Sequence, residues 1–407
     1  MTPTARRPPA TAALVALAIG SFGIGMTEFV VMGLLPDLAR DLLPAAWAAN
    51  PETAIAQAGV LISLYALGVV IGAPTIAGSV ARFPRHRVMI ALALALTVFN
   101  SLTFLAPNFE WMAVSRLLAG LPHGAYFGIG ALVASDVLGP GRRAQGVAFV
   151  LTGLTVANVV GVPVGTFLGQ HYGWRATFMV VAAIFALATM CIAWFVPRHE
   201  GSPERTLRAE LRVFRIGQVW LTLAIGAIGF GGFFAVNSYV APMVTEVAGA
   251  PSWAVPVVLV ISGIGMTIGN LIGGRLADRD LRRTLLGAFV GTAAVLALIG
   301  LTAQWIFVLA AMLFALNFCG SILAPSIQTR LMDVAEDNQS IAAALNHSSL
   351  NVGNSLGAAF GGAVIAAGWG FVAPAWVGVA MALIGLALTA VGFTLVRRER
   401  ELAPAAC

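Results

Sequence analysis

A carboxylate, a guanidinium and an imidazole interrupt stretches of sequence that are otherwise apolar. Glu28 lies in the apolar run of residues 12–36, and Arg116 and His123 lie in the run of residues 111–136. Burial favours the neutral form of a carboxyl group and a nearby cation favours its charged form, so a carboxyl group under both influences can take up and release a proton. We therefore expect Glu28 to couple proton movement to the work of the protein, with Arg116 as the charge that tunes it and His123 as a candidate relay. The alternative is a static role for all three in helix packing.

The composition indicates that these groups lie inside a lipid bilayer. The chain has 407 residues, of which 59% are hydrophobic and only 10% are charged, and its mean hydropathy is +0.91. A soluble globular domain carries about 25% charged residues. An ionisable side chain at the centre of a membrane span costs roughly 2.5 to 3.5 kcal/mol, so it is expected to face a partner or water. The sequence therefore predicts an all-α membrane protein.

Twelve apolar runs are long enough to cross a bilayer, which takes about 20 residues for a helix. We place the spans at residues 12–36, 56–79, 88–106, 111–136, 145–168, 175–197, 218–243, 254–274, 284–302, 305–329, 342–366 and 373–396. A rise of about 1.5 Å per residue puts His123 near the membrane midplane, Glu28 roughly 6 Å outward of it and Arg116 roughly 12 Å outward. The three groups are thus expected at neighbouring depths on the first and fourth spans.

The basic residues predict the orientation of the chain. All 23 of them are arginine, and between the spans they fall almost entirely on one side, against Arg40 and Arg175 on the other. Because short loops rich in Arg and Lys stay in the cytoplasm, both termini are expected to be cytoplasmic. The net charge of +6 then belongs to the surface of the inner membrane, and no nucleic-acid partner is expected.

The chain contains an internal repeat. The stretch NVVGVPVG at residues 158–165 recurs as NSLGAAFG at residues 354–361, a shift of 196 positions that also relates GSVARFPRHR to GRLADRDLRR; glycines of the first span recur in the seventh at a shift of 206. Transporter folds are commonly built from such repeats. We therefore predict two homologous six-helix bundles, residues 1–197 and 218–407, joined by a cytoplasmic linker at 198–217. The linker has an arginine-rich face opposite an apolar one, which is typical of a helix on the inner leaflet; a solvated linker is the alternative.

Several motifs resemble those of a known family. RLLAG in the fourth span, GRLADRDLRR after the eighth and the Gly- and Pro-rich fifth span together resemble the major facilitator superfamily. Within it, GMTEFVVMGLLPDLARDL and GVPVGTFLGQHYGWR are similar to the twelve-span drug:proton antiporters of the arabinose-efflux-like and chloramphenicol-exporter branch. The resemblance covers nearly the whole chain. It implies a major facilitator fold, in which the first and fourth spans line a central cavity that opens alternately to each side of the membrane.

The resemblance also assigns residues to gating loops on the cytoplasmic side and to a helix that is characteristic of antiporters. The gating residues are Arg82, Arg85, Arg87, Gly274, Asp278, Arg279, Arg282 and Arg283, and the antiporter-like helix carries Gly153, Gly161, Pro163 and Gly165. Gly274 would let two spans approach, and Asp278 would cap a helix or pair with an arginine of its loop. Asp136 is expected to act as a cap or to pair with Arg142. The alternatives are arginines that only enforce topology, and a fifth span that only packs the two halves together.

Aromatic and amide side chains on the central spans are the candidates for substrate contact. They are Phe22, Met26, Tyr126, Phe127, Phe230, Phe234, Asn237, Phe314, Asn317, Phe318, His347 and Asn351. Aromatic surface with a few amides suits a flat, weakly polar, largely uncharged molecule. For each aromatic ring, packing against lipid or a neighbouring helix is the alternative.

Other classes of function lack their residues in this sequence. An ATP-driven pump needs the lysine of GxxxxGK[ST], and the chain has no lysine. The sequence has no recognisable nucleophile and base pattern and no HExxH-type metal spacing, so we expect no enzyme activity, no metal and no cofactor. We predict a monomeric exporter of drugs or antibiotics in the cytoplasmic (inner) membrane, driven by a proton gradient, with chloramphenicol-like compounds as the leading substrates. The alternative is a carrier, for efflux or uptake, of a sugar, a nucleoside or a similar metabolite.

Overall fold

A computed structural model of the chain describes residues 10–80, 83–139, 143–198, 215–335 and 339–402. Every regular element within these ranges is a helix. The predictions for Arg82, for Arg142 and for most of the linker, residues 199–214, lie outside the described residues.

The first half of the chain forms seven long helical segments and several short ones. In order they are α1 (Ala10–Leu42), α2 (Pro44–Ala49), α3 (Pro51–Ala58), α4 (Val60–Val80), α5 (Arg85–Phe104), α6 (Phe109–Leu138), α7 (Arg143–Val156), the π-helical η1 (Ala157–Gly161), α8 (Val162–Tyr172) and α9 (Trp174–Phe195). Asparagine side chains begin two of them: Asn50 Oδ1 accepts the Thr53 N–H at the start of α3, and Asn108 Oδ1 accepts the Trp111 N–H at the start of α6.

The second half repeats the pattern with more interruptions. Its elements are α11 (Gly217–Ala224), η3 (Ile225–Gly229), α12 (Gly231–Asn237), α13 (Val240–Pro242), η4 (Met243–Val247), α14 (Ala254–Thr302), α15 (Ile306–Val334), α16 (Gln339–Val364), η5 (Ile365–Trp369) and α17 (Ala373–Leu402). Among the described residues, four π-helical segments break spans five, seven and eleven, and three of them lie in this half. Such segments carry one extra residue per turn and occur often at functional sites.

Eleven helices in the described part of the chain are long and apolar enough to cross a membrane. One of them, α14, is 49 residues long, which is more than twice the ~20 residues that one span needs. Its backbone leaves the helical conformation at Asp280, with φ −155° and ψ 91°, so that two spans meet there without a loop. The predicted twelve membrane crossings are therefore present, and the eighth and ninth are joined in α14.

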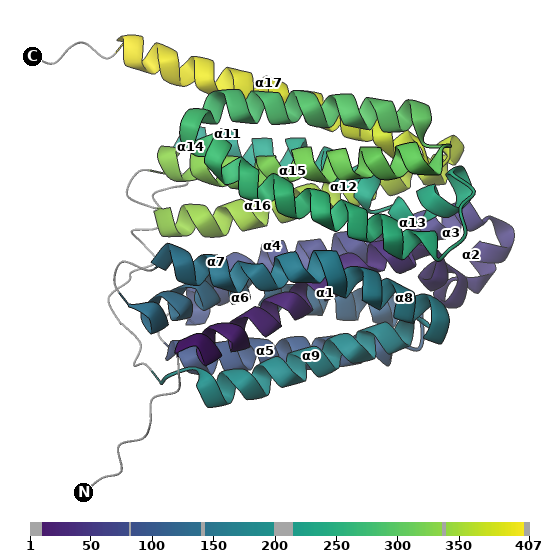
Figure 1. The fold of residues 1–407 in the computed structure, drawn as a ribbon, viewed down its shortest axis with the longest axis horizontal. Coiled ribbons are helices and arrows are strands. Elements are labelled where there is room, and N and C mark those ends of the chain that lie inside the picture. The colour runs from purple at the N-terminus through teal and green to yellow at the C-terminus, as the bar shows by residue number, and fades with distance from the viewer. Residues whose placement is uncertain (1–9, 81–82, 140–142, 199–214, 336–338, 403–407) are drawn as a thin grey trace, which may run out of the picture.

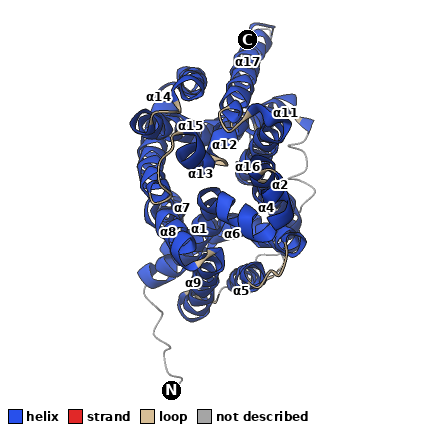
Figure 2. Cartoon of the chain, turned by 90° about the vertical axis from the view of Figure 1, so that its right-hand side faces the viewer, coloured by secondary structure: helices blue, strands red, loops and turns tan. Residues whose placement is uncertain are grey.

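The helices run side by side along one axis in two groups (Figure 1). The helices α1 and α4–α9 form one group and α11–α17 the other, and the view along the bundle in Figure 2 shows the same division. The start of α1 and the end of α17 lie at the same end of the molecule, together with the start of α5, whereas α2 and α3 lie at the opposite end. Since the arginine-rich loops belong to the first of these ends, it is the cytoplasmic end.

Two seams hold the groups together. In one seam, α16 of the second half packs against α4 of the first; in the other, α14 packs against η1 and α8. Ser63 and Ser355 bridge the first seam reciprocally, since each hydroxyl donates to the other residue's carbonyl oxygen at 3.1 and 3.2 Å. In the second seam a Cβ on Gly263 would lie 2.5 Å from the carbonyl oxygen of Asn158, so only glycine allows this approach.

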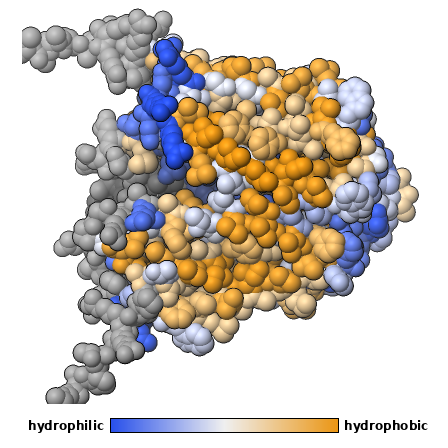
Figure 3. All heavy atoms as spheres, viewed as in Figure 1, coloured by the Kyte–Doolittle hydropathy of each residue, from blue (hydrophilic) through white to orange (hydrophobic). Residues whose placement is uncertain are grey.

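The outer surface is that of a membrane protein. Figure 3 shows a broad hydrophobic band across the middle of the molecule, with hydrophilic residues gathered at its two ends. Large apolar side chains such as Leu271 and Phe307 are 63% and 88% exposed. Such surface would be unfavourable in water and is stable against lipid tails.

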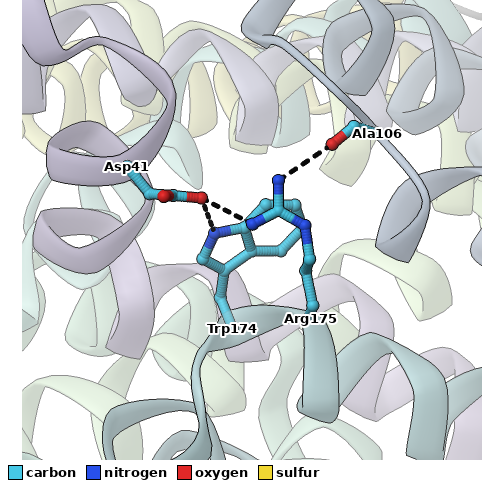
Figure 4. Close-up of polar contacts among 4 residues, drawn as sticks. All are labelled: Asp41, Ala106, Trp174 and Arg175. Atoms are coloured by element: carbon cyan, nitrogen blue, oxygen red, sulfur yellow. Dashed lines mark hydrogen bonds and ion pairs between the residues drawn. The ribbon is translucent and has the colours of Figure 1, made fainter.

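The GWR motif at the start of α9 builds an anchor at the outer end of the first half (Figure 4). Gly173 turns the chain with a φ of +84°, which glycine adopts without strain. The Asp41 carboxylate then accepts from Trp174 Nε1 at 2.8 Å and from Arg175 Nη1 at 2.6 Å, while Arg175 Nη2 donates to the Ala106 carbonyl at 3.0 Å. The anchor ties the end of α1 to α9 and to the loop between α5 and α6.

Candidate functional site

Glu28 is buried in the middle of the bundle, where the two halves meet. Its side chain on α1 is 7% exposed, and its Oε1 accepts a hydrogen bond of 3.2 Å from Asn354 Nδ2 on α16. The direct partner of the carboxylate is therefore an amide of the opposite half, which the sequence analysis did not predict. From the sequence, Asn354 was identified only as the first residue of a repeated motif.

Arg116 is fully buried on α6 and is not paired with Glu28. Its Nη1 donates to Thr27 Oγ1 at 2.9 Å, and Thr27 in turn donates to Asn100 Oδ1 at 2.6 Å. The guanidinium lies 4.1 Å from the centroid of the Tyr65 ring, a cation–π contact. Arg116 was predicted as the charge that tunes Glu28, and that role stays a prediction. Successive residues of a helix point about 100° apart, so the side chain that Arg116 contacts on α1 is Thr27.

Arg116 also keeps unused hydrogen-bonding capacity. Its Nε and Nη2 are buried without a partner in the described part of the chain. A buried cation without a carboxylate is costly unless something else stabilises it, and the aromatic faces of Tyr65 and, at 5.7 Å, Phe178 supply part of that stabilisation. The site thus holds a fixed positive charge beside α1.

His123 and His347 form a second polar contact between the halves. Their Nε2 atoms lie 3.1 Å apart, and their rings are edge to face with centroids 5.2 Å apart. Phe127 packs edge to face against both, and Tyr65 lies 5.6 Å from His123, so a continuous row of rings extends from Arg116 to the second half. His347, predicted as a substrate contact, is here the partner of His123.

A small cavity lies between the halves on the other side of α1. Its volume is about 40 Å³, and no charged side chain lines it. Its lining is Phe29, Met32, Asn158, Val162, Phe233, Phe234, Asn237, Leu259, Ser262, Gly263, Met266 and Asn317. A drug-sized ligand needs roughly 300–1,000 Å³, so the halves must part to admit one here.

Three of the predicted substrate contacts line this cavity: Phe234, Asn237 and Asn317. Asn317 Nδ2 donates to Asn237 Oδ1 at 3.1 Å, which joins α15 to α12. Phe29 and Phe234 face each other across the halves with parallel planes and centroids 6.5 Å apart. Phe29, Asn158 and Ser262 also line the cavity but were not predicted from the sequence. Asn158 and Ser262 are polar residues inside apolar spans, which was a usable signal.

The other predicted substrate contacts pack elsewhere. Phe22 and Met26 lie against Gly161 on the antiporter-like helix, where both come within 2.8 Å of the position of an added Cβ. Tyr126 is fully buried and donates to the Leu17 carbonyl at 3.0 Å. Phe230 stacks on Phe233 in the core of the second half.

The remaining three also have local partners. Phe314 and Phe318 border the glycines at which α14 and α15 approach each other. Asn351 Nδ2 donates to the His347 carbonyl one turn before it, and its Oδ1 is buried without a partner in the described residues. None of the three lines the cavity between the halves.

The antiporter-like helix packs along the middle of α1, from Ala18 to Leu34. A Cβ on Gly153 would overlap the carbonyl oxygen of Ala18, and one on Gly165 would lie 3.0 Å from Val30. Pro163 is buried near the start of α8, directly after the π-helical η1. The glycines therefore serve close helix contact within the first half, while the Asn158 backbone meets α14 across the seam.

The predicted gating contacts are partly replaced by others. Arg85 at the start of α5 forms an ion pair with Asp136 at the end of α6. The predicted pairing of Asp136 with Arg142 lies outside the described residues. In the second loop Asp280, and not Asp278, takes the capping role, since its Oδ1 accepts the Arg283 N–H at 2.9 Å. Asp280 also pairs with the Arg283 side chain at 3.2 Å. Its place at the break in α14 explains the exchange, because only there are backbone N–H groups free.

Gly274 does not bring two spans together. A Cβ on Gly274 would meet no atom within 4 Å in the described part of the chain, whereas one on Gly273 would lie 2.8 Å from the Ile322 Cα. The predicted close approach therefore belongs to the preceding residue, because Gly274 points away from α15. Arg87, Arg279 and Arg282 are exposed near the cytoplasmic end.

Comparisons with known proteins agree with this architecture. The sequence model of the Major Facilitator Superfamily matches residues 17–279 and 252–406. The inner membrane transport protein YdhP of Escherichia coli (strain K12) is 36% identical over 358 residues, which cover 88% of this chain and 90% of that protein. A chloramphenicol resistance protein of Streptomyces lividans is 28% identical over 353 residues, covering 84% of this chain and 86% of that protein.

A solved structure shows the same fold. The D-xylose-proton symporter superposes with a TM-score of 0.75 at 15% sequence identity, covering 93% of this chain and 97% of that one. The match extends over both groups of helices, as do the matches in sequence. With its twelve membrane crossings and two seams, the chain belongs to the Major Facilitator Superfamily and is a multi-pass transporter of the inner membrane, not an enzyme.

Proposed function

We propose that this transporter is a proton-coupled exporter, a drug:H⁺ antiporter that works by alternating access. Two halves, residues 1–197 and 218–407 with the linker 198–217 between them, rock against each other in a monomer, and the proton gradient is the energy source without a bound cofactor. The leading substrates are uncharged amphipathic compounds of the chloramphenicol kind. The observation that carries the proposal is the hydrogen bond between Glu28 of the first half and Asn354 of the second.

A proton on Glu28 changes the strength of that bond. An ionised carboxylate accepts the amide N–H as a charge-assisted hydrogen bond, which is roughly twice as strong as a bond between neutral groups. Protonation of Glu28 removes the charge and so weakens the contact between the halves. Because Glu28 is 7% exposed, a proton reaches or leaves it only when the halves part on one side.

Arg116 supplies the positive charge that such a carboxylate needs in the membrane. Its Nη1 is bonded to Thr27, the residue directly before Glu28. Charges interact over longer distances in a protein interior than in water, because the effective dielectric constant is lower there. Arg116 can therefore offset the charge of Glu28 without a direct ion pair, and the carboxylate stays free to bond across the seam.

The cavity between the halves supports an uncharged substrate. Aromatic, aliphatic and thioether groups line most of it, and its polar groups are amides and one hydroxyl. A ligand with a net charge would leave that charge unpaired in such a place. The relative named a chloramphenicol resistance protein points to the same class of compound.

A carrier for a sugar, a nucleoside or a similar metabolite is the second candidate. It is favoured by the amide pair Asn237 and Asn317, because amides bond readily to the hydroxyl groups of such molecules. The ring faces of Phe29 and Phe234 would then stack on the apolar face of a sugar or on a base. Export of an amphipathic drug driven by a proton gradient would favour the drug exporter, and the absence of such export would favour the metabolite carrier.

The test is transport into inverted membrane vesicles from a host without its own exporters. A proton gradient is imposed, and accumulation is measured for a panel of antibiotics headed by chloramphenicol. Glu28→Gln keeps the shape of the side chain and an acceptor oxygen for Asn354 Nδ2 but cannot take up a proton. Glu110→Gln, the same change at an exposed acid in the first turn of α6, is the matched control.

We expect gradient-driven accumulation that falls at least tenfold in the Glu28 variant and is unchanged in the Glu110 variant. Undiminished gradient-driven flux in the Glu28 variant would contradict its role in coupling. If no compound on the panel accumulates, the export of drugs is refuted and the metabolite carrier becomes the leading candidate.

A further inference from the structure

Buried side chains on three helices of the first half form a directed chain of hydrogen bonds. Asn100 on α5 donates from Nδ2 to the Leu96 carbonyl at 2.8 Å. Its Oδ1 accepts from Thr27 Oγ1 on α1 at 2.6 Å. Thr27 Oγ1 in turn accepts from Arg116 Nη1 on α6 at 2.9 Å. The chain thus ends on the guanidinium, and its three side chains are fully buried.

Each bond in this chain sets the direction of the next one. The bond from Asn100 Nδ2 to the backbone fixes the amide, so that Oδ1 faces α1. A hydroxyl group has one hydrogen and two lone pairs. Because the Thr27 hydrogen is donated to Asn100, a lone pair is left to accept from Arg116. Asn100 therefore orients the Thr27 hydroxyl, and the hydroxyl fixes one end of the guanidinium.

Thr27 uses its hydroxyl differently from other threonines of the membrane helices. Thr97, Thr189 and Thr267 each donate to the carbonyl four residues before them, at 2.8 or 2.9 Å. Such a local bond is common for a threonine inside a helix. In the described part of the chain, the Thr27 hydroxyl is bonded instead to side chains of α5 and α6. Its contacts are therefore set by the neighbouring helices and not by α1 itself.

Arg116 keeps the capacity to pair with Glu28. Thr27 and Glu28 are neighbours on α1, and a guanidinium pairs strongly with a carboxylate through two parallel hydrogen bonds. The Nε and Nη2 groups of Arg116 have no partner among the described residues, so they are available for such a pair. The two charged groups instead have separate partners, Thr27 for Arg116 and Asn354 for Glu28.

The aromatic neighbours of Arg116 do not explain this separation. The guanidinium lies 4.1 Å from the centroid of the Tyr65 ring and 5.7 Å from that of Phe178. A ring face attracts the positive charge as a whole and does not select which N–H group points where. The bond to Thr27 is the contact that fixes the direction of an N–H group.

We propose that Thr27 and Asn100 are positioning residues for Arg116. They hold its guanidinium away from the Glu28 carboxylate. The inference rests on the proposed function, in which Glu28 binds and releases the proton. A direct ion pair would keep Glu28 ionised and draw it away from Asn354, so that the proton could no longer be exchanged. With the guanidinium held back, its charge acts on the carboxylate only from a distance.

The test measures how fast Glu28 reacts with N,N′-dicyclohexylcarbodiimide, an apolar reagent that modifies protonated carboxyl groups. The purified full chain is treated at a single pH, and mass spectrometry follows the peptide that contains Glu28. Thr27→Val removes the hydroxyl and keeps the shape, Thr27→Ser keeps the hydroxyl, and Asn100→Leu removes the acceptor. Thr177→Val is the matched control, because Thr177 is also fully buried and donates to the Gly165 carbonyl at 2.7 Å.

We expect Thr27→Val and Asn100→Leu each to slow the modification of Glu28 by about tenfold, since a direct ion pair favours the charged carboxylate, which does not react. Thr27→Ser and Thr177→Val should react at the wild-type rate. In a chain that also carries Arg116→Gln, Thr27→Val should have no effect, because no guanidinium is left to reach the carboxylate. Thr27→Val and Asn100→Leu change different helices, so either one decides the outcome if the other does not fold.

Several results would overturn the positioning role. One is a wild-type rate in Thr27→Val or Asn100→Leu, and another is an equal loss in Thr177→Val. An effect of Thr27→Val that persists beside Arg116→Gln would show that Thr27 does not act through the guanidinium. A wild-type Glu28 that does not react would also overturn the role, because the carboxyl group would then be held ionised in spite of the hydrogen bonds.

The labelling needs neither a proton gradient nor a substrate, so its outcome is separate from that of the transport experiment. Labelling of Glu28 that depends on Thr27, together with no gradient-driven export, refutes the exporter and keeps the positioning role. Gradient-driven export that depends on Glu28, together with labelling that is insensitive to Thr27, keeps the exporter and refutes the positioning role.

Discussion

His123 and His347, one from each half of the transporter, face each other with their Nε2 atoms 3.1 Å apart. A hydrogen bond between two such nitrogens needs one that carries a hydrogen and one that does not. At least one of the two rings is therefore neutral whenever the contact is made. Arg116 and Tyr65 lie along the same row of rings on the side of His123, and Asn351 bonds to the backbone of His347.

Removal of one imidazole should break this contact. His347→Phe keeps an aromatic ring in the row but has no nitrogen that can bond to His123 Nε2. Spin labels at the exposed positions Arg87 and Arg279 should report a longer distance between the cytoplasmic ends in this variant than in the wild type. An unchanged distance would show that the contact does not hold the two halves together.

The Tyr65 ring should matter to stability, whereas its hydroxyl should not. The hydroxyl is buried without a partner in the described residues, and the ring faces Arg116 at 4.1 Å. Tyr65→Phe should leave the free energy of unfolding of the purified protein within about 0.5 kcal/mol of the wild-type value, since no hydrogen bond is lost. Tyr65→Leu should destabilise it by roughly 2 kcal/mol, the value of a desolvated cation–π contact. Equal unfolding temperatures for the two variants would contradict the role of the ring.

A methyl group at Gly59 should keep the outer end of the bundle from closing. A Cβ there would overlap the hydroxyl of Tyr239, which crosses from the second half and donates to the Ala358 carbonyl at 2.7 Å. Gly59→Ala should reduce the transport rate several-fold and increase the reactivity of cysteines placed in the outer part of the seam. Gly128→Ala, at a position with no atom within 4 Å in the described residues, is the control and should transport normally.

Gly153 of the antiporter-like helix and Gly274 of the second gating loop should respond differently to alanine. Gly153→Ala forces a Cβ against the Ala18 carbonyl and should destabilise the protein by about 1–3 kcal/mol, the usual cost of overpacking. Gly274→Ala enters open space and should be neutral within about 1 kcal/mol, because alanine is the better helix former. Thermal unfolding in the same detergent measures both. Similar losses in the two variants would show that Gly274 makes a contact after all.

The spans could be predicted from the sequence because the signal is local. The lipid-facing apolar runs are long, and the predicted first span at 12–36 lies within α1. The boundary between the eighth and ninth spans was placed in a loop, but α14 runs through it with one non-helical residue, Asp280. Charged residues between two spans mark the membrane surface. They can also lie within a helix, so they do not show that the helix ends there.

The contacts between the halves could not be predicted in the same way. Glu28 and Asn354 are 326 positions apart in the sequence. The depth of a residue in the membrane shows which residues lie at the same level, but it does not show which of them is the partner. The partner is determined by the direction in which a side chain points from its helix, as the pairing of Arg116 with Thr27 shows. The duplicated motif contains Asn354 and Asn158, but it was used only to predict the two homologous halves.

The two seams described above bear on the ancestry of the molecule. Ser63 and Ser355, which bond reciprocally in one seam, correspond by the shift of 196 to Leu259 and Val159 in the other. If six-helix subunits had met as a homodimer, both seams would have been identical by symmetry, and each substitution would have altered both at once. In a single chain that constraint does not apply. One seam has the paired hydroxyls of Ser63 and Ser355, and in the other Gly263 packs against the backbone of Asn158. A single mutation therefore changes the packing of one seam and leaves the other unchanged.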